Sequence, residues 1–214
     1  MTAPLRLAVL ISGGGTTLQN LIDRVAAGLL PAQIVGVVSS RPEVQGVERA
    51  RKAGLPVEVI ERPKSFGGPG VTASQTLFPA RVWAAIRGFA PDLVCFAGWL
   101  HLLPIPEEFH NKVLNIHPSL LPAFGGKGMH GQHVHEAVLA AGVRVSGCTV
   151  HFADDTFDTG PILVQRCVPV MDHDDLTALA RRVFAAECEA YPEAIRLIAE
   201  NRVSIRGRRV VISG

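Results

Sequence analysis

The sequence predicts an α/β protein with a mostly parallel sheet that is covered by helices on both faces. Short apolar runs rich in Val, Ile and Leu alternate with segments of helical spacing through the first half of the chain. These runs are nearly continuous in apolar residues, as expected for strands buried on both faces. Two longer strand-like runs then follow each other without an intervening helix. The predicted class is therefore a Rossmann-like fold with a long antiparallel strand pair toward the C-terminus.

The alternating part begins with an apolar run that ends in three glycines, and Gly28 closes the helix that follows. The elements expected in this part are a strand at 6–12, a helix at 17–28, a strand at 34–40, a helix at 44–54, a strand at 56–60, a helix and a fourth strand within 81–99, and a fifth strand at 112–118.

The pattern changes after about residue 142. Strand-like runs at 144–153 and 160–170 are separated by the turn-rich segment 154–159, so they are expected to pair as a long hairpin or a mixed edge. A last helix over 174–200 has Asp174 or Asp175 as its N-cap.

Composition excludes several classes of protein. The 214 residues are enough for one full core, and 48% hydrophobic and 19% charged residues describe an ordinary globular chain. A net charge of +2 argues against a nucleic-acid surface. The one dense basic stretch, 202–209 with four arginines, is more simply a solvated tail or an edge strand.

Cysteine spacing and the N-terminus indicate a cytoplasmic protein. The four cysteines (Cys95, Cys148, Cys167 and Cys188) contain no CxxC pair and are expected to be reduced, buried thiols. The apolar run 5–11 ends in glycines instead of a cleavage site, and no apolar stretch approaches the ~20 residues that span a bilayer. We therefore expect no membrane partner.

The glycine-rich turn after the first strand, "SGGGTT", is a candidate anion site. A helix N-terminus offers unpaired N–H groups and a partial positive charge, and Thr16 and Thr17 can add hydroxyl donors. No Walker A lysine follows, and Leu18 stands where a dinucleotide fingerprint needs its third glycine. A single phosphate, as in a mononucleotide or phosphosugar, suits the pattern, although a tight turn that binds nothing remains an alternative.

Asn115 and His117 lie two residues apart at the end of the fifth strand, so they project from the same face. Open α/β sheets bind ligands at the carboxyl ends of their strands. An amide and an imidazole are suitable groups for an oxyanion that forms at a carbonyl. Among the nearby aspartates, Asp158 precedes a "TGP" turn that would fix its direction, and it would raise the pKa of His117. A capped strand end with turn-forming aspartates explains the same spacing equally well.

Two long motifs, "NIHPSLLPAF" and "GCTVHFADDTFDTGPILVQ", resemble the formyl-tetrahydrofolate-dependent formyltransferases. The resemblance runs in order from about Leu5 to Glu200. Together with "VLISGGGTTLQ", it implies formyl transfer from 10-formyltetrahydrofolate to the amine of glycinamide ribonucleotide in purine biosynthesis. It also implies one domain over 1–214, with a phosphate-binding part at about 1–100 and a folate-binding and catalytic part at about 100–200.

Residue roles follow from the same resemblance. The residues that would act in catalysis are Asn115, His117 and Asp158. Those that would bind the ribonucleotide are Gly15, Thr16, Thr17 and Glu187. Those that would bind the folate are Leu100, His101, Leu102, Leu103 and Asn115, with the backbone of "DDTFD" around the pteridine.

Glu187 has some support from spacing, because it continues an apolar stripe of the last helix and a buried acid needs a partner. A helix-edge glutamate that reaches water is the alternative. The chain also departs from the family pattern. Gln75 stands where relatives often have an arginine, His101 replaces an arginine of some relatives, and the loop 125–131 is a longer variant in which Lys127 or His130 could reach a ligand.

No metal site is expected. His130, His133 and His135 lack an HExxH spacing, and the last two would face different ways on a helix, so helix-start and surface histidines explain them better. The expected partners are two small-molecule substrates, with no nucleic acid, and the chain would be a monomer or a homodimer. There are three alternatives. A deformylase would use the same trio with water, although such enzymes usually carry an N-terminal regulatory domain. A methionyl-tRNA formyltransferase needs a further C-terminal domain, and a non-catalytic phosphosugar sensor would use the glycine turn alone.

Overall fold

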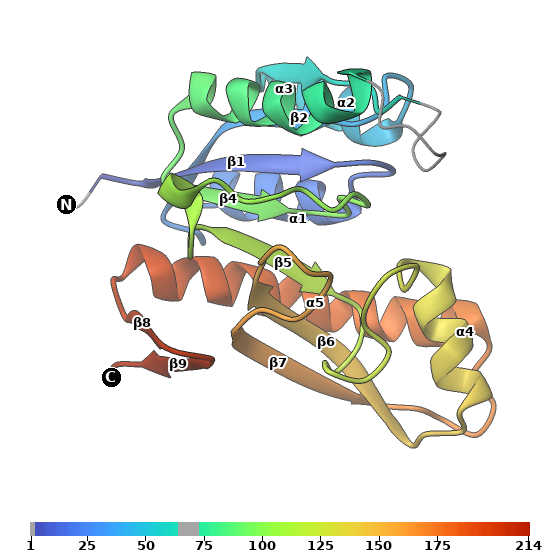
Figure 1. Cartoon of the computed structure of the whole chain (residues 1–214). Coiled ribbons are helices and arrows are strands. Elements are labelled where there is room, and N and C mark those ends of the chain that lie inside the picture. The colour runs from blue at the N-terminus through green and yellow to red at the C-terminus, as the bar shows by residue number, and fades with distance from the viewer. Residues whose placement is uncertain (1–2, 64–72) are drawn as a thin grey trace. The chain divides into compact units, whose positions relative to one another are not determined.

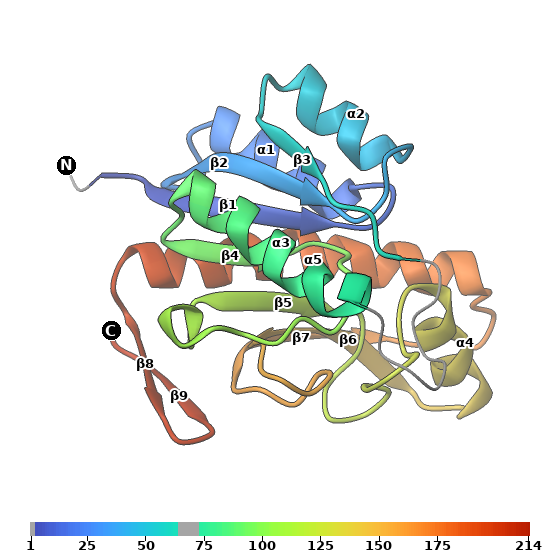
Figure 2. The same cartoon turned by 45° about the horizontal axis from the view of Figure 1, so that its top comes forward.

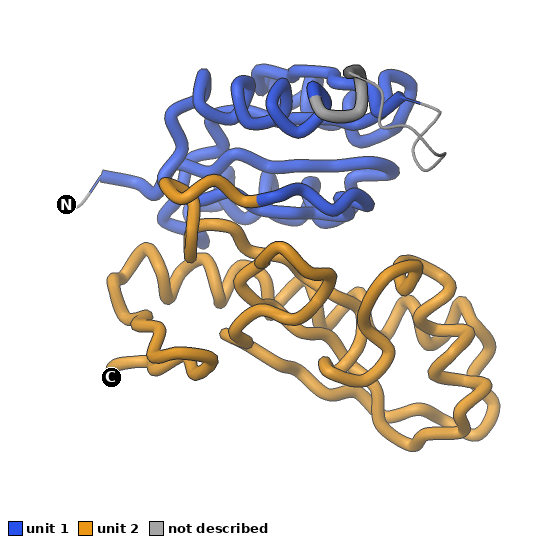
Figure 3. The backbone as a smooth tube through the Cα atoms, viewed as in Figure 1, with its two compact units in different colours: residues 1–104 blue, residues 105–214 orange. Residues whose placement is uncertain are grey.

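The computed structural model describes residues 3–63 and 73–214, except for the side chains of 73–76. The chain divides into two compact units, residues 1–104 and 105–214, which Figure 3 colours separately. The boundary lies close to the division near residue 100 that the sequence suggests between the two functional parts. That the two parts form one functional domain stays a prediction.

Unit 1 is a parallel α/β layer structure. Its strands lie in the order β3-β2-β1-β4, and each neighbouring pair runs parallel. The elements are β1 (Leu5–Ile11), α1 (Thr16–Ala26), β2 (Ala32–Ser39), α2 (Gln45–Lys52), β3 (Val57–Val59), α3 (Ala73–Phe89) and β4 (Leu93–Phe96). The chain leaves β1 at its carboxyl end through the glycine turn and enters α1 directly (Figure 1).

The core of unit 1 explains the continuous apolar strands. The side chains of residues 7–11 are all 0% exposed, because helices cover β1 from both sides. Helix α1 contacts α2 and β2, while α3 crosses in front of the strands in Figure 2. Gly36 of β2 touches the ring of Phe89 so closely that a Cβ there would overlap it. A glycine at this position therefore lets α3 approach the sheet.

Helix α3 begins at Ala73, earlier than the helix expected within 81–99. Pro79 lies inside the helix instead of before its start. A proline removes one N–H donor and restricts the preceding residue, which is why the pattern favours a helix start after it. The packing of Phe78 (3% exposed) and Val82 (0%) on this helix overrides that local preference.

Unit 2 carries the predicted antiparallel strand pair. Its strands lie in the order β5-β6-β7-β9-β8, with β6 antiparallel to β5 and β7. The elements are a 3₁₀ turn (Glu107–Phe109), β5 (Val113–His117), α4 (Gln132–Ala140), β6 (Val145–Phe152), β7 (Ile162–Pro169), α5 (Leu176–Ala199), β8 (Val203–Arg206) and β9 (Arg209–Ile212). The predicted fold class is confirmed. The basic stretch 202–209, expected to be a solvated tail or an edge strand, lies in the hairpin of β8 and β9 at the edge of the sheet.

Helix α5 covers β6 and β7 and forms the core of unit 2. Asp175 is its N-cap, since its Oδ1 accepts the Ala178 N–H at 2.7 Å. Tyr191 is fully buried, and its hydroxyl donates to the Leu114 carbonyl of β5 at 3.1 Å. In the part of the chain that the structure describes, none of the helices is long and apolar enough to cross a membrane.

The expectation that the cysteines are all buried is wrong for Cys167. Cys95 and Cys148 are buried as predicted, but Cys188 is only half-buried and Cys167 lies exposed on β7. The register pairs β7 with β9 only at Ile162 and Arg209, so the rest of that edge is open. An apolar run on an edge strand therefore buries fewer side chains than one in the middle of a sheet.

Candidate active site

The glycine turn of unit 1 is shaped by close backbone packing. Gly15 has φ +67°, and a Cβ on it would lie 2.5 Å from Cα of Gly46 at the start of α2. No side chain caps the N-terminus of α1. Thr16 is exposed and Thr17 is half-buried, so both hydroxyls can reach a ligand. The turn and the first turn of α1 thus form a surface of uncapped N–H and O–H donors.

Helix α2 sets the direction of the peptides in this turn. The Gly13 carbonyl accepts the Gly46 N–H at 3.2 Å, and the Gly14 carbonyl accepts Nε of Arg49 at 3.0 Å. In a trans peptide the C=O and the next N–H point in opposite directions. The N–H groups of Gly14 and Gly15 therefore point away from α2. Arg49 is not apparent from the sequence, because an arginine on an amphipathic helix carries no signal of its own.

The segment after β4 in unit 1 holds the four consecutive residues predicted to bind folate. Leu100 donates its N–H to Oγ of Ser12 at 3.2 Å, which ties the segment to the glycine turn. Leu103 is buried (2% exposed), whereas Leu102 is 42% exposed. Of the two, only Leu102 presents its side chain to solvent, so a ligand would meet Leu103 through its backbone.

His101 has a defined tautomer in this segment. Arg62 can only donate, and its Nη1 lies 3.0 Å from Nδ1 of His101, so the hydrogen of the uncharged ring is on Nε2. Burial, together with Arg62 and Arg41, lowers the pKa of His101 to about 4. Its ring packs edge-on against Trp99. The Gln75 side chain, the predicted departure from the family arginine, lies outside the described residues.

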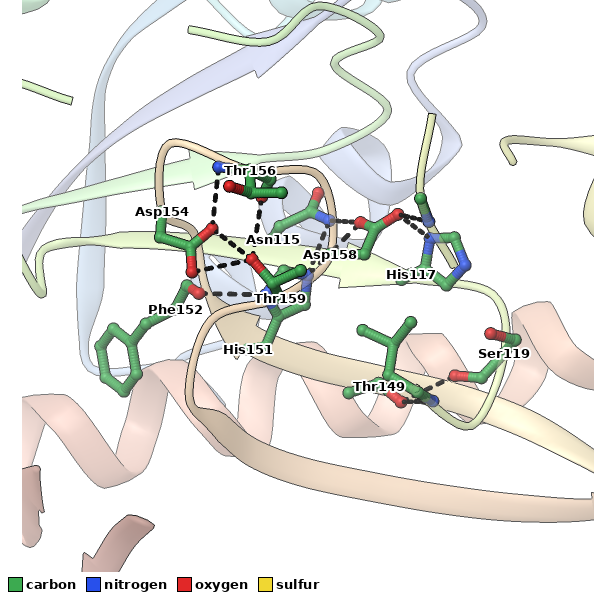
Figure 4. Close-up of polar contacts among 12 residues, drawn as sticks. Asn115, His117, Ser119, Thr149, His151, Phe152, Asp154, Thr156, Asp158 and Thr159 are labelled. Atoms are coloured by element: carbon green, nitrogen blue, oxygen red, sulfur yellow. Dashed lines mark hydrogen bonds and ion pairs between the residues drawn. The ribbon is translucent and has the colours of Figure 1, made fainter. Parts of the chain in front are cut away.

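Asn115, His117 and Asp158 come together in unit 2, as Figure 4 shows. Asn115 and His117 lie on β5 and pair in register with His151 and Thr149 of β6. Asp158 lies in the connection between β6 and β7, with φ +59°, a conformation that Asp adopts more readily than most residues.

The amide of Asn115 has both of its hydrogens engaged. Nδ2 lies 3.0 Å from Nε2 of His151 and donates to Oδ1 of Asp158 at 3.3 Å. Oδ1 of Asp158 also lies 3.7 Å from the same nitrogen of His151. His151 is not apparent from the sequence, and its place opposite Asn115 follows only from the register of β5 and β6.

His117 is buried between a carboxylate and a carbonyl. Its Nδ1 lies 3.5 Å from Oδ2 of Asp158, and its Nε2 donates to the Phe124 carbonyl at 2.8 Å. Burial lowers the pKa of His117, and this effect outweighs the opposing influence of Asp158 and Phe124. Asp158 by itself raises the pKa of His117, as expected. The net pKa is nevertheless lowered, because desolvation disfavours the imidazolium more strongly.

Asp158 is held as an ionised acceptor. Oδ2 accepts the Gly126 N–H at 2.9 Å. Burial raises the pKa of this carboxyl, but the neighbouring imidazole of His151, the charge of His117 and the Gly126 N–H together bring the net pKa below its usual value. A Cβ on Gly125 would lie 3.3 Å from Cβ of Asp158, so the loop packs directly on this side chain.

The chain that leaves β5 is fixed by a buried hydroxyl. Oγ1 of Thr149 donates to the Ser119 carbonyl at 2.7 Å and accepts the Leu121 N–H at 3.0 Å. Gln165 of β7 donates to the same hydroxyl and to the Leu121 carbonyl, both at 3.0 Å. These bonds hold the backbone directly after His117 in one path.

Glu187 lies on α5 and is partly buried. Burial raises its pKa to about 7. Glu187 is close enough to Cys148 of β6 to influence the pKa of that thiol. Within residues 3–63 and 73–214, no hydrogen bond or ion pair satisfies its carboxylate. Glu187 is therefore a partly buried acid with no partner among the described residues, and its role as a ribonucleotide ligand stays a prediction.

The α4 histidines do not form a metal site in the part of the chain that the structure describes, where no group of three or more His, Cys, Asp or Glu residues could share an ion. His133 is exposed and lies 3.2 Å from Glu136, whereas His135 is 6% exposed. The prediction that they face different ways is confirmed. His135 is not the surface residue that was expected, because α4 turns it inward.

Comparison with known proteins identifies similar chains. Residues 5–195 match the family model described as formyl transferase. A chloroplastic phosphoribosylglycinamide formyltransferase of Vigna unguiculata is 40% identical over 92% of this chain. The trifunctional purine biosynthetic protein adenosine-3 of Gallus gallus is 41% identical over 95% of it. The chain spans 62% of the length of the first relative and 19% of the second.

A solved structure supports the fold over the whole chain. The crystal structure of glycinamide ribonucleotide transformylase 1 from Symbiobacterium toebii aligns with a TM-score of 0.89 and 41% sequence identity. The alignment covers 100% of this chain and 96% of that one.

Proposed function

The chain belongs to the formyl transferase family, and from this premise we propose that it transfers the formyl group of 10-formyltetrahydrofolate to the amine of 5'-phosphoribosylglycinamide in de novo purine biosynthesis. Support comes from relatives about 40% identical whose names carry this activity or this pathway. The structural neighbour named for the same substrate matches the chain from end to end.

The observation that carries the proposal is the cluster of Asn115, His117 and Asp158. In the proposed reaction the amine nitrogen attacks the formyl carbon, and the carbonyl electrons move to oxygen. The imidazole of His117 meets this oxyanion as a donor once its Nε2 exchanges the bond to the Phe124 carbonyl for one to the substrate, and Asp158, at Nδ1, stabilises the imidazolium form that donates. The bond from carbon to the folate nitrogen then breaks, and a proton from the amine passes to that nitrogen.

Asn115 is the second proposed oxyanion donor. Its Nδ2 hydrogens are engaged by His151 at 3.0 Å and by Asp158 at 3.3 Å, so one bond must be exchanged before the amide can donate to substrate. The longer bond to Asp158 is the weaker of the two by geometry. We therefore propose that this hydrogen turns from the carboxylate to the oxyanion as charge develops.

Substrate binding is proposed at both units. The phosphate of the ribonucleotide would accept from the turn at Gly15, Thr16 and Thr17, where α1 has no side-chain cap. The folate would bind at 100–103 and Asn115, with the exposed side chain of Leu102 offering apolar contact. Glu187 would accept from the ribose hydroxyls, since its carboxylate has no hydrogen bond among the described residues.

Location and assembly complete the proposal. We place the protein in the cytoplasm, as its cysteine usage suggests, with two small-molecule substrates and no nucleic-acid partner. A monomer or a homodimer would suffice, because each proposed role belongs to residues of one chain. The folate acts as a co-substrate that is consumed, and no proposed step needs a metal ion.

The alternative is a deformylase, which would use the same trio with water as the nucleophile. A spectrophotometric assay with 10-formyl-5,8-dideazafolate, a 10-formyltetrahydrofolate analogue, separates the two reactions. Release of the deformylated product only when phosphoribosylglycinamide is present is the expected result. Release without the ribonucleotide would identify a deformylase, and no release in either reaction would favour a non-catalytic phosphosugar sensor.

A further inference from the structure

His151 lies beside the three proposed catalytic residues and has no role in the reaction as described above. It is 1% exposed, on β6, and stands opposite Asn115 in the strand register. Figure 4 shows its ring beneath the amide of Asn115. A buried imidazole must have its two nitrogens matched to a donor and an acceptor, so its partners define its state.

The hydrogen bonds of His151 assign its tautomer. Nδ1 lies 3.0 Å from the carbonyl oxygen of Phe152, which can only accept, so Nδ1 carries the hydrogen. In the uncharged ring Nε2 is then the acceptor. The group 3.0 Å from Nε2 is the amide of Asn115, which must therefore present its NH₂ end.

The same reasoning fixes the amide on its other side. Oδ1 of Asp158 is a carboxylate acceptor and lies 3.3 Å from Nδ2 of Asn115. Both neighbours of this end of the amide are acceptors, so a rotation by half a turn would place Oδ1 of Asn115 against two acceptors. One hydrogen is anchored on His151, and the other is shared with Asp158.

We propose that His151 is a positioning residue that acts through Asn115, holding the amide so that its donor end, and not its carbonyl, faces the developing oxyanion. Anchoring one hydrogen on Nε2 leaves the second free to move from Asp158 to substrate without rotation of the amide. Without this anchor the amide can turn its carbonyl toward the oxyanion, and two oxygens would then repel each other. The inference rests on the proposed function of the same site.

Three substitutions separate this role from a space-filling one. His151→Gln places an amide oxygen near the position of Nε2 and can keep the acceptor. His151→Asn reaches only the position of Nδ1, and His151→Leu keeps bulk without any acceptor. We expect kcat to fall about 10- to 100-fold in the Asn and Leu variants, with KM for both substrates nearly unchanged, because the reacting groups are bound but misdirected. The Gln variant should keep most of the wild-type kcat.

A double-mutant cycle tests whether His151 acts through Asn115. In the Asn115→Ala background, His151→Leu should cause little further loss of the single-turnover rate, since the amide that it positions is gone. Multiplied losses in the double variant, or equal rates for the Gln and Leu variants, would overturn the proposal. The wild-type rate is measured with and without the ribonucleotide in the same experiment. A wild-type protein without ribonucleotide-dependent transfer would contradict the proposed function itself, whatever the His151 variants do.

The tautomer of His151 can also be measured directly on the wild-type protein, without any activity assay of a variant. Two-bond ¹H–¹⁵N spectra of histidine-labelled protein report which ring nitrogen carries the hydrogen, and the signals of His151 are identified by their loss in the His151→Gln protein. The expected result is a hydrogen on Nδ1 and none on Nε2. A hydrogen on Nε2 would make that nitrogen a donor toward Asn115 and would contradict the proposal.

Discussion

Nδ1 of His117 faces Oδ2 of Asp158 at 3.5 Å, while the other ring nitrogen donates to the Phe124 carbonyl at 2.8 Å. Since Phe124 takes the Nε2 hydrogen, an uncharged His117 would point the lone pair of Nδ1 at a carboxylate. The pair forms a hydrogen bond only when a proton lies between the two atoms. His117 and Asp158 are therefore arranged to share one proton at the place where the proposed reaction needs to move one.

Arg49 gives a prediction for the glycine turn. Arg49→Met removes the donor to the Gly14 carbonyl and a positive charge beside the proposed phosphate site. We expect KM for phosphoribosylglycinamide to rise about 5- to 20-fold, the size of one charge-assisted hydrogen bond, with kcat nearly unchanged. Steady-state kinetics with the ribonucleotide, and with the same substrate lacking its phosphate, measure this effect.

The phosphate dependence distinguishes this role from general damage to unit 1. KM for the substrate without phosphate should be the same in Arg49→Met and wild type. Arg51→Met, an exposed position on the same helix, is the matched control and should leave both KM values unchanged. An equal rise in KM for the two substrates would show that Arg49 has no particular relation to phosphate.

Replacing Glu187 should make the folded protein more stable and its binding of the ribonucleotide weaker. Burial raises its pKa from 4.5 to about 7, so the folded state holds more protons than the unfolded state between these pH values. The free energy of unfolding contributed by this group therefore falls as pH rises through that window. Glu187→Gln should stabilise the protein by about 1–3 kcal/mol at pH 8 and have little effect at pH 4, as measured by urea unfolding.

The same variant should bind the ribonucleotide more weakly, because an amide is a poorer acceptor than a carboxylate for ribose hydroxyls. Equal stability of Glu187→Gln and wild type at pH 8 would mean that the carboxylate is solvated and not buried.

His101 predicts a loss of stability in acid. Its pKa is lowered from 6.5 to about 4, first by burial and then by Arg62 and Arg41. The unfolded state binds more protons between these values, so the contribution of His101 to the free energy of unfolding falls as pH drops from 6.5 to 4. His101→Gln should reduce the difference in urea midpoint between pH 7 and pH 4.5.

A matched control for this experiment is His173→Gln, at an exposed position. It should leave the pH dependence of the midpoint as it is in wild type. An unchanged pH dependence in His101→Gln would contradict the assignment of a buried, uncharged ring.

Much of the fold follows from local pattern. The continuous apolar runs of β1 and β2 predict buried parallel strands, and the pair Asp174 and Asp175 predicts the start of α5, where the structure has Asp175 as the N-cap. The start of α3 lies eight residues before the expected segment 81–99, because the packing of Phe78 overrides the local effect of Pro79 within the helix. The exposure of Cys167 depends on which strand lies at an open edge, and that is a property of the sheet order.

The site was predictable only where it follows a strand end or a long motif. Asn115, His117 and Asp158 stand at such positions, and the structure brings them together. His151 requires the register of β5 and β6, and Arg49 requires the packing of α2 on the glycine turn. The net direction of the His117 pKa depends on its burial, which spacing in sequence does not report.

The measurement that tests the central claim most directly is the single-turnover rate of formyl transfer in His117→Ala and Asn115→Ala. His110→Ala, which removes only a ring bonded to the Ile105 carbonyl, serves as the control. We predict that each of the first two variants folds normally and transfers the formyl group at least about 10²- to 10³-fold more slowly than wild type, while the control keeps its rate. Near-normal transfer by folded His117→Ala or Asn115→Ala would contradict the account.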